Sequence, residues 1–240
     1  AHYNGGTLRN AIPREAEAVV TILSEDKTDF MAAVDEFFST LRREYGFIED
    51  GLVFKAEEIS LPKTLLPEEI QDDLINAVVA CHNGVYRMIP DAPEVVETSS
   101  NLSIVRTSEG LVEIQILVRS SSETMKMALA SELESTFALA GARVEFDGAY
   151  PGWEPNFKSD ILNLMKKIYP QVTGKEADVK MMHAGLECGI IGANYPGLDM
   201  ISFGPTIKHP HSPNEKVKIS TVETFWKLLV AVLENIPEKD

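Results

Sequence analysis

The sequence predicts a two-part fold: an α+β part with a mainly antiparallel sheet over residues 1–147, joined to a parallel α/β part over residues 148–240. Strand-like and helix-like segments are interleaved in the first part, which ends in a hairpin, a helix and a strand. The stretch GAYPGWEPN at 148–156, with two glycines and two prolines, then breaks the regularity. Beyond it, short strands alternate with helices, as in a parallel sheet.

The first four segments follow from turn residues and periodicity. The glycines of residues 4–7 predict a tight turn. Residues 15–23 are rich in Val, Ile and Thr and predict a strand. Residues 29–45 carry apolar side chains at helical spacing, and Gly46 can end that helix. Residues 52–59 are interpreted as a second strand.

The rest of the first part contains two helices and a hairpin. Residues 67–82 predict a helix, because acidic residues at its start favour the positive end of the helix dipole. Strands at 95–106 and 111–119 are joined by Ser-Glu-Gly, which indicates a hairpin. A third helix at 123–139 precedes a short strand at 142–146. The face of this helix that we expect to be apolar comprises Met127, Ala130, Leu133 and Phe137.

The second part alternates regularly. Helices are predicted at 160–169, 187–191 and 221–233, and buried strands at 177–182 and 200–203. Ligands usually bind at the carboxyl ends of strands in such open sheets, so the segments after these two strands are the first places to look for a site.

Composition excludes several classes of protein. Of 240 residues, 44% are hydrophobic and 25% charged, as in an ordinary globular protein. A net charge of −15 disfavours a nucleic-acid partner, which needs clustered Lys and Arg. No apolar run approaches a membrane span, so no membrane partner is expected. Two isolated cysteines exclude a zinc ribbon and fit a reducing, cytoplasmic compartment.

The run HAGLECG at 183–189 follows the first of these strands. Its residues Gly185 and Gly189 allow close backbone approach to a ligand, and amides opening the next helix could hold a carboxylate or an oxyanion. The run is therefore a candidate ligand-binding segment.

The run GPTIKHPHSPNE at 204–215 follows the second strand. A neutral imidazole is a good zinc ligand, and prolines would stiffen the loop that holds it, so His209 and His211 are either metal ligands or part of a structural loop. The adjacent acidic pairs Glu57-Glu58 and Glu68-Glu69 are interpreted as solvated charges.

Five motifs, in order along the whole chain, resemble aminoacyl-histidine (Xaa-His) dipeptidases, which belong to the co-catalytic zinc peptidases together with carnosinases and aminoacylases. They are NGGTLRNAIPREA, VETSSNL, GAYPGWEPN, HAGLECG and GPTIKHPHSPNE. The resemblance implies that residues 1–147 form an α+β lid. Residues 148–240 would then be the C-terminal portion of a zinc-bearing α/β catalytic domain.

The resemblance also assigns roles. It makes His211 a metal ligand, Asn10 a lid residue that reaches the substrate, and Arg119 the partner of the substrate carboxylate. His183, Gly185 and Glu187 fall in a substrate-binding loop. Against these roles, Arg119 could be a surface charge at a strand end, and Asn10 a turn residue that caps its own backbone.

The remaining ligands of such enzymes, and their catalytic base, have no counterpart in this sequence. We therefore expect no catalytic residue in the chain, and expect it to be inactive alone. The whole enzyme would hydrolyse dipeptides, preferentially with C-terminal histidine, using water activated by two zinc ions, or by cobalt or manganese. A homodimer formed through the lid is expected. The alternatives are a non-catalytic dimerisation or binding module, or a metallo-amidase or dipeptidase of different specificity.

Overall fold

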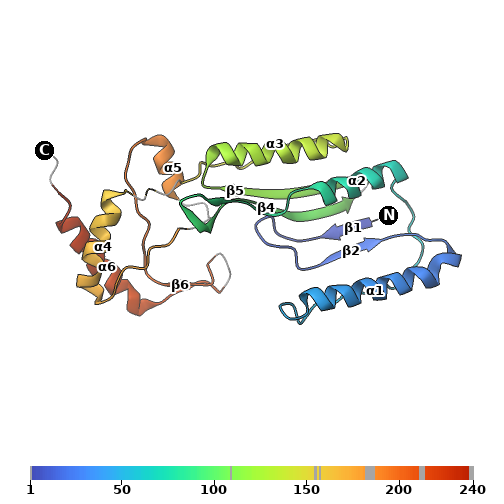
Figure 1. Ribbon diagram of the computed structural model, residues 1–240, viewed down its shortest axis with the longest axis horizontal. Coiled ribbons are helices and arrows are strands. Elements are labelled where there is room, and N and C mark those ends of the chain that lie inside the picture. The colour runs from blue at the N-terminus through green and yellow to red at the C-terminus, as the bar shows by residue number, and fades with distance from the viewer. Residues whose placement is uncertain are drawn as a thin grey trace. The chain divides into compact units, whose positions relative to one another are not determined.

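The computed structural model describes residues 2–108, 110–153, 156, 158–181, 187–210 and 214–237. They form two compact units (Figure 1). The first comprises Ala1–Ala80 and Asn101–Leu117, and the second Cys81–Ser100 and Val118–Asp240. The boundary expected at 147/148 falls inside the second unit, and the division into lid and catalytic portions stays a prediction.

The larger of two sheets in the described residues has five strands. The strand order is β2 (Ala16–Val19), β1 (His2–Gly5), β4 (Ala92–Ser108) and β3 (Gly84–Ile89), and β5 (Leu111–Ser120) also pairs with β4. The long strand β4 (Ala92–Ser108) pairs antiparallel with β1 through Val105 and Arg106, and antiparallel with β3 through residues 92–100. The expected mainly antiparallel sheet of the first part is therefore confirmed.

In the first unit, β1 (His2–Gly5) and β2 (Ala16–Val19) form an antiparallel pair. The turn expected at residues 4–7 begins later than predicted, because residues 2–5 belong to β1. Gly6 has φ +72°, and a Cβ there would lie 1.8 Å from the carbonyl oxygen of Ser103. Only glycine fits this crossing of β1 over β4.

Two helices complete this unit: α1 (Lys27–Tyr45) follows a short 3-10 turn at Ser24–Asp26, and α2 spans Glu68–Ala80. Both confirm sequence predictions. The strand expected at 52–59 is wrong, because this segment finds no strand to pair with. Instead, the ring of Phe54 packs against those of Phe37 and Phe38 on α1, at centroid distances of 5.3 and 6.4 Å.

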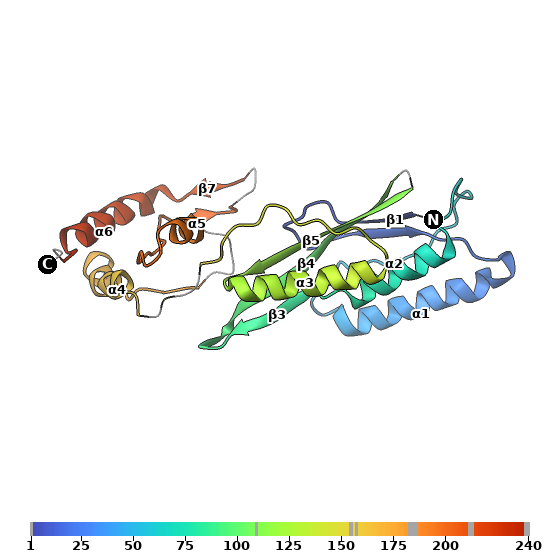
Figure 2. The same cartoon turned by 90° about the horizontal axis from the view of Figure 1, so that it is seen from above.

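The second unit begins with β3 (Gly84–Ile89), which the sequence prediction missed because it follows α2 almost directly. Gly110, at φ +81°, precedes β5 (Leu111–Ser120), so the predicted hairpin with β4 is confirmed. Helix α3 (Glu123–Leu139) lies along this hairpin (Figure 2). It buries Leu129 completely, whereas Met127, predicted for that face, is 57% exposed.

Helices α4 (Asp160–Thr173) and α6 (Val222–Glu234) pack together in the same unit, and a 3-10 turn at Ile219–Thr221 leads into α6. Their shared core contains Met165, Ile168, Leu228 and Val232. The helix α4 was expected to end at residue 169, before Pro170, but continues for four more residues. Val172 packs on this core, and Gly174, at φ +70°, closes the helix by donating to the Pro170 carbonyl.

The parallel sheet expected in the second part is not observed among the described residues. Residues 177–181 and 200–203, where its strands were expected, lie outside any strand, and so do residues 142–146, where the last strand of the first part was expected. A strand needs a hydrogen-bonded neighbour, and no described segment pairs with these three. The strands found in the described residues after 147 are β6 (Ile207–Lys208) and β7 (Lys216–Val217), an antiparallel pair. The fold is mixed α/β with antiparallel sheets.

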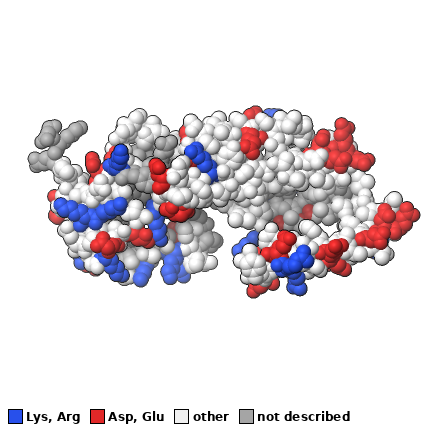
Figure 3. Space-filling view, in the orientation of Figure 1, with Lys and Arg blue, Asp and Glu red and all other residues white. Residues whose placement is uncertain are grey.

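Charge is unevenly distributed on the face drawn in Figure 3. Asp and Glu side chains gather over the first unit, and Lys and Arg side chains over the C-terminal helices of the second. Among the residues that the structure describes, every helix is too short or too polar to cross a bilayer.

Candidate substrate-binding site

Arg119 lies one residue before the end of β5 and is half-buried. The serines that follow it fix this strand end. The Ser120 hydroxyl lies 2.8 Å from the Thr98 hydroxyl of β4 and accepts the Ser122 N–H at 3.0 Å. The Ser122 hydroxyl then caps α3 by accepting from the Met125 N–H. The backbone directly after Arg119 is therefore held in place.

The loop 148–153 crosses this strand end at Gly152. A Cβ on Gly152 would lie 2.8 and 2.7 Å from the carbonyl oxygens of Ser120 and Ser121. Because those atoms belong to the backbone, they could not move aside as a flexible side chain does. A glycine is therefore required where this loop meets the residues after Arg119.

Lys126 of α3 fastens the same loop. Its Nζ donates to the Tyr150 carbonyl oxygen at 2.8 Å and lies 2.7 Å from the Glu123 carboxylate. The Lys126 side chain is only 15% exposed. Sequence reasoning gave this lysine no role, since nothing in a helix sequence shows which loop its side chain will reach.

The described end of the HAGLECG motif, residues 187–189, also contacts this loop. Helix α5 (Glu187–Asn194) confirms the helix predicted there, although it runs three residues longer. A Cβ on Gly189 would lie 2.5 Å from the Pro151 carbonyl oxygen. Gly189 was expected to admit a ligand, but its close neighbour is this loop. The two residues after Arg119, the loop at Pro151 and Gly152, and Gly189 of α5 are thus linked by successive close backbone approaches.

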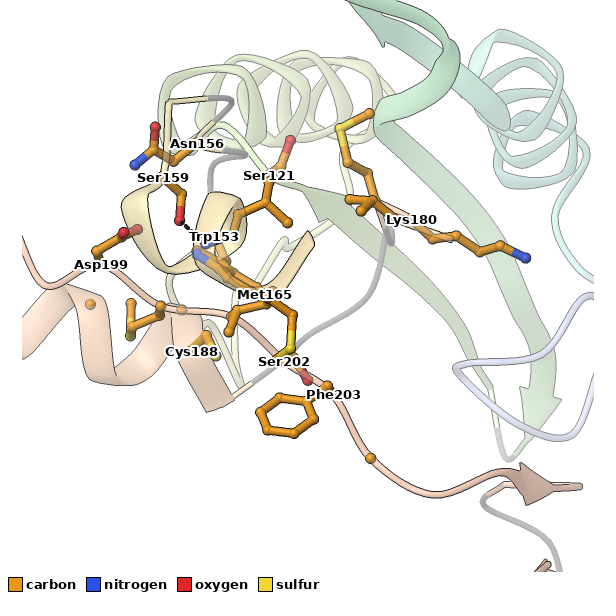
Figure 4. Close-up of a pocket in the computed structure, with 18 of the residues that line it drawn as sticks. Ser121, Trp153, Asn156, Ser159, Met165, Lys180, Cys188, Asp199, Ser202 and Phe203 are labelled. Atoms are coloured by element: carbon orange, nitrogen blue, oxygen red, sulfur yellow. Dashed lines mark hydrogen bonds between the residues drawn. The ribbon is translucent and has the colours of Figure 1, made fainter. Parts of the chain in front are cut away.

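A cavity of about 1220 Å³ lies in the second unit beside these contacts (Figure 4). This volume exceeds that of typical small-molecule sites, so the cavity is not shaped for a dipeptide alone. Its lining includes Ser121, Trp153, Asn156, Cys188, Asp199 and Phe203. Four of the five motifs contribute described residues to this lining, and NGGTLRNAIPREA contributes none.

Asp199 lines this cavity and binds the N-terminus of α4. Its Oδ2 accepts the Ile161 N–H at 2.9 Å. Partial burial acts to raise the pKa of Asp199, but hydrogen bonds from the Ile161 amide and the Ser159 hydroxyl, with others, outweigh burial and hold the pKa below its ordinary value. A carboxylate at a helix N-terminus is stabilising, so a structural role at the start of α4 accounts for Asp199 without a role in binding.

Asn10 belongs to the first unit, where it lies exposed in the turn between β1 and β2. The Asn101 side-chain amide donates to the Ala11 carbonyl at 2.8 Å, and the Ser103 hydroxyl donates to the Arg9 carbonyl at 2.5 Å. The sequence analysis did not predict that Asn101, in the VETSSNL motif, and Ser103, directly after it, would bind this turn. The pattern that could have indicated it is that both residues are polar, two positions apart and on one face of a strand.

Only some of the other predicted site residues lie in the described part of the chain. Glu187 is exposed at the first residue of α5. His183, Gly185 and His211 lie outside the described residues. His209, before that last gap, has φ 53°, in the left-handed region.

Within the described ranges, no three His, Cys, Asp or Glu side chains gather as metal ligands would. These residues therefore do not fit a zinc pair by themselves. Of the acidic pairs, Glu57 and Glu58 contact Lys55 and Lys27 at the surface, each at 2.5 Å, which lowers the pKa of both carboxyls. Their interpretation as solvated charges is confirmed.

Neither cysteine forms a disulfide. Burial, with the nearby Glu132 charge, raises the pKa of Cys81 to about 11. This thiol is therefore protonated at neutral pH and is unsuited to nucleophilic catalysis.

Comparison with known proteins extends over the whole chain. Residues 25–235 match the sequence profile of peptidase family M20/M25/M40. The chain is 40% identical over 238 residues to the cytosol non-specific dipeptidase of Escherichia coli (strain K12). That alignment covers 99% of this chain and 49% of the relative.

A solved structure is similar over the same extent. The crystal structure of aminoacylhistidine dipeptidase from Vibrio alginolyticus aligns with a TM-score of 0.91 and 42% identity. The alignment covers 100% of this chain and 49% of that one. The chain thus spans about half the length of the relatives that it matches.

Proposed function

The chain belongs to peptidase family M20/M25/M40, whose members are typically metal-dependent, and on that premise we propose that it is the C-terminal part of a cytoplasmic metallodipeptidase that prefers dipeptides ending in histidine. The observation that carries this proposal is the alignment of the full chain with an aminoacylhistidine dipeptidase at a TM-score of 0.91. The Escherichia coli relative is named a cytosol dipeptidase, which supports the compartment.

In this proposal, Arg119 binds the carboxylate of the dipeptide. A guanidinium donates two parallel hydrogen bonds to a carboxylate, and every dipeptide ends in one. The fixed strand end around Ser120 limits where the guanidinium can go, which favours one substrate orientation.

Asn10 would contribute a side-chain amide to the same substrate. An amide can donate to a carbonyl oxygen or accept from an N–H, and a dipeptide offers both. Glu187, with His183 and Gly185, would border the substrate where α5 begins.

His211 is proposed as the one metal ligand in this chain. Since the described residues offer no group of three metal-ligating side chains, the other ligands would come from the part of the relatives that this chain does not span. It follows that the chain by itself should not hydrolyse dipeptides.

A related dipeptidase of broader specificity is the second candidate. It is favoured by the relative from Escherichia coli, which is named non-specific and is almost as similar as the histidine-directed enzyme. The two candidates differ in whether histidine is required at the C-terminal position.

The test is an assay of the longer protein that contains this sequence, with and without added zinc, on β-alanyl-histidine, glycyl-histidine and alanyl-alanine. We expect metal-dependent cleavage of both histidine dipeptides, abolished by His211→Ala. Equal cleavage of alanyl-alanine would favour the broader candidate. No cleavage, or cleavage by the 240-residue chain alone, would contradict the proposal.

A further inference from the structure

The turn that carries Asn10 is held from both sides by side chains of β4. Ser103 donates to the carbonyl of the residue before Asn10, and Asn101 to the carbonyl of the residue after it. The turn itself is closed by the Ala11 N–H, which donates to the Leu8 carbonyl at 3.2 Å. Asn10 thus lies between two anchored carbonyls on a closed turn.

The two side chains that bind the turn, Asn101 and Ser103, are themselves held in place. Ser103 is completely buried and Asn101 is half-buried. Their side chains also bond each other, since the Asn101 amide donates to the Ser103 hydroxyl oxygen at 3.1 Å. Gly6 presses against the Ser103 carbonyl just before the turn begins. The turn is therefore fastened to β4 at its entry and at its exit.

Burial does not explain the order of this turn. Thr7, Leu8, Arg9 and Asn10 are all exposed, so the turn has little apolar contact to hold it. An exposed turn of this kind normally opens at small free-energy cost. Long-range hydrogen bonds from the buried Ser103 and the half-buried Asn101, about ninety residues away in sequence, restrict it here.

We propose that Asn101 and Ser103 are positioning residues, which hold Asn10 in the place where it meets the substrate. This inference rests on the proposed function, in which Asn10 contacts the dipeptide. A contact to a small substrate is effective only when its backbone is placed to within a fraction of an ångström. The pair supplies that placement without touching the substrate.

The first experiment measures hydrogen exchange in the 240-residue chain. Asn101→Ala and Ser103→Ala each remove one anchor, and exchange of the Ala11 amide should rise about tenfold. Asn235→Ala and Ser135→Ala are the matched controls, because each removes a side-chain hydrogen bond of 2.8 Å to a carbonyl elsewhere. Unchanged exchange at residues 8–11 in both anchor variants would overturn the inference.

The second experiment is a double-mutant cycle in the longer enzyme, read as kcat and KM for β-alanyl-histidine. If Asn101 acts through Asn10, Asn101→Ala should lower kcat/KM about fivefold or more. In the double variant, Asn101→Ala should change kcat/KM less than twofold relative to Asn10→Ala alone. The loss caused by Asn101→Ala alone should fall on kcat and KM in the same proportion as the loss caused by Asn10→Ala. The two controls should leave both constants unchanged.

The outcomes separate the inference from the proposed function. Additive losses, or an Asn10→Ala variant as active as the parent, overturn the positioning role while dipeptide cleavage stands. A longer protein that cleaves no dipeptide overturns the proposed function. The exchange measurement then still decides whether the two side chains hold the turn.

Discussion

Several polar side chains of this protein bind backbone groups that are remote in sequence. Asn101 and Ser103 bind carbonyls of the Asn10 turn, and Lys126 binds a carbonyl of the loop that crosses the end of β5. Asp199 does the converse, accepting a backbone N–H at the start of α4. Asn101, Ser103 and Lys126 bind exposed turn or loop segments, so they should affect local order more than global stability.

Asp199→Asn should destabilise the chain at neutral pH and not in acid. The folded protein lowers the pKa of this carboxyl, so its contribution is present above the ordinary value of about 3.9 and is lost as the pH falls through the lower folded value. Because the side chain is exposed, we expect about 0.5 kcal/mol.

Urea unfolding at neutral and acid pH would measure this difference. The control is Asp178→Asn, which removes a carboxylate that pairs with Lys180 at the surface, at 3.1 Å. A loss for Asp199→Asn that persists unchanged below the folded pKa would contradict an electrostatic origin.

Arg119→Ala should weaken the substrate's carboxylate contact in the longer enzyme. Losing a hydrogen-bonded charge of this kind lowers kcat/KM by roughly ten- to a hundredfold. The sharper measurement compares a dipeptide with its C-terminal amide. The parent should strongly prefer the free carboxylate, and the variant should lose most of that preference.

Arg143→Lys is the control for Arg119, because Arg143 is an exposed arginine that pairs with Glu145. It should keep both the rate and the preference. If Arg119→Ala still discriminates between carboxylate and amide as the parent does, then Arg119 is a surface charge at a strand end, which is the alternative given in the sequence analysis.

At the scale of elements, helices were easier to predict than strands. The helix at 123–139 matches α3 at both ends, since its periodicity and its Ser122 cap are local signals. The segments 52–59, 177–181 and 200–203 have strand composition but no partner among the described residues. Pairing depends on a distant neighbour, which periodicity does not reveal.

The candidate site was predictable only where a motif marked it. Asn10, Arg119 and Glu187 came from resemblance to a family. The contacts that join their surroundings came from the structure, because Gly152 and Gly189 meet backbone that is remote in sequence. A glycine in a sequence shows that space is needed, but not what fills that space.

Gly189→Ala should therefore destabilise α5 and the loop that it contacts. Its new Cβ would lie 2.5 Å from the Pro151 carbonyl oxygen, which cannot move without shifting the loop. Overpacking of this kind costs about 1–3 kcal/mol. Urea unfolding, with hydrogen exchange of residues 187–194, would measure it.

Gly192→Ala is the matched control in the same helix. Its Cβ would meet only the end of the Met200 side chain, at 2.9 Å, and that methyl group can swing aside. Alanine also favours a helix over glycine, so this variant should be neutral or stabilising. Equal destabilisation by both substitutions would show that the Pro151 contact is not what matters at Gly189.

At the scale of the molecule, the chain matches about half of each relative, and its second unit contains extended segments without partners among the described residues. In the proposed enzyme, the residues that pair with those segments would belong to the other half. The first unit is different, because its strands β1, β2 and β4 already pair with one another. The first unit is therefore the better place to look for association between copies.

The homodimer expected from sequence would use the free side of β2, the last strand in the order β2-β1-β4-β3 of the described residues. Gly6 donates to the Glu15 carbonyl, so Gly6 and Glu15 are a hydrogen-bonded pair of the β1-β2 ladder. Hydrogen-bonded and non-hydrogen-bonded pairs alternate along an antiparallel ladder, so Asn4 and Glu17 are the next hydrogen-bonded pair. Ala18 then directs its N–H away from β1, towards an edge that a second copy could extend.

Light scattering of the 240-residue chain without metal should give a mass near twice 26.5 kDa. Ala18→Pro removes an outward donor and spares the bonds to β1, so it should shift the chain towards the monomer, while circular dichroism stays that of a folded protein. A parent chain that is monomeric, or an Ala18→Pro dimer as tight as the parent, would exclude association through this edge. Dimerisation that survives metal removal would also separate the role of the first unit from catalysis.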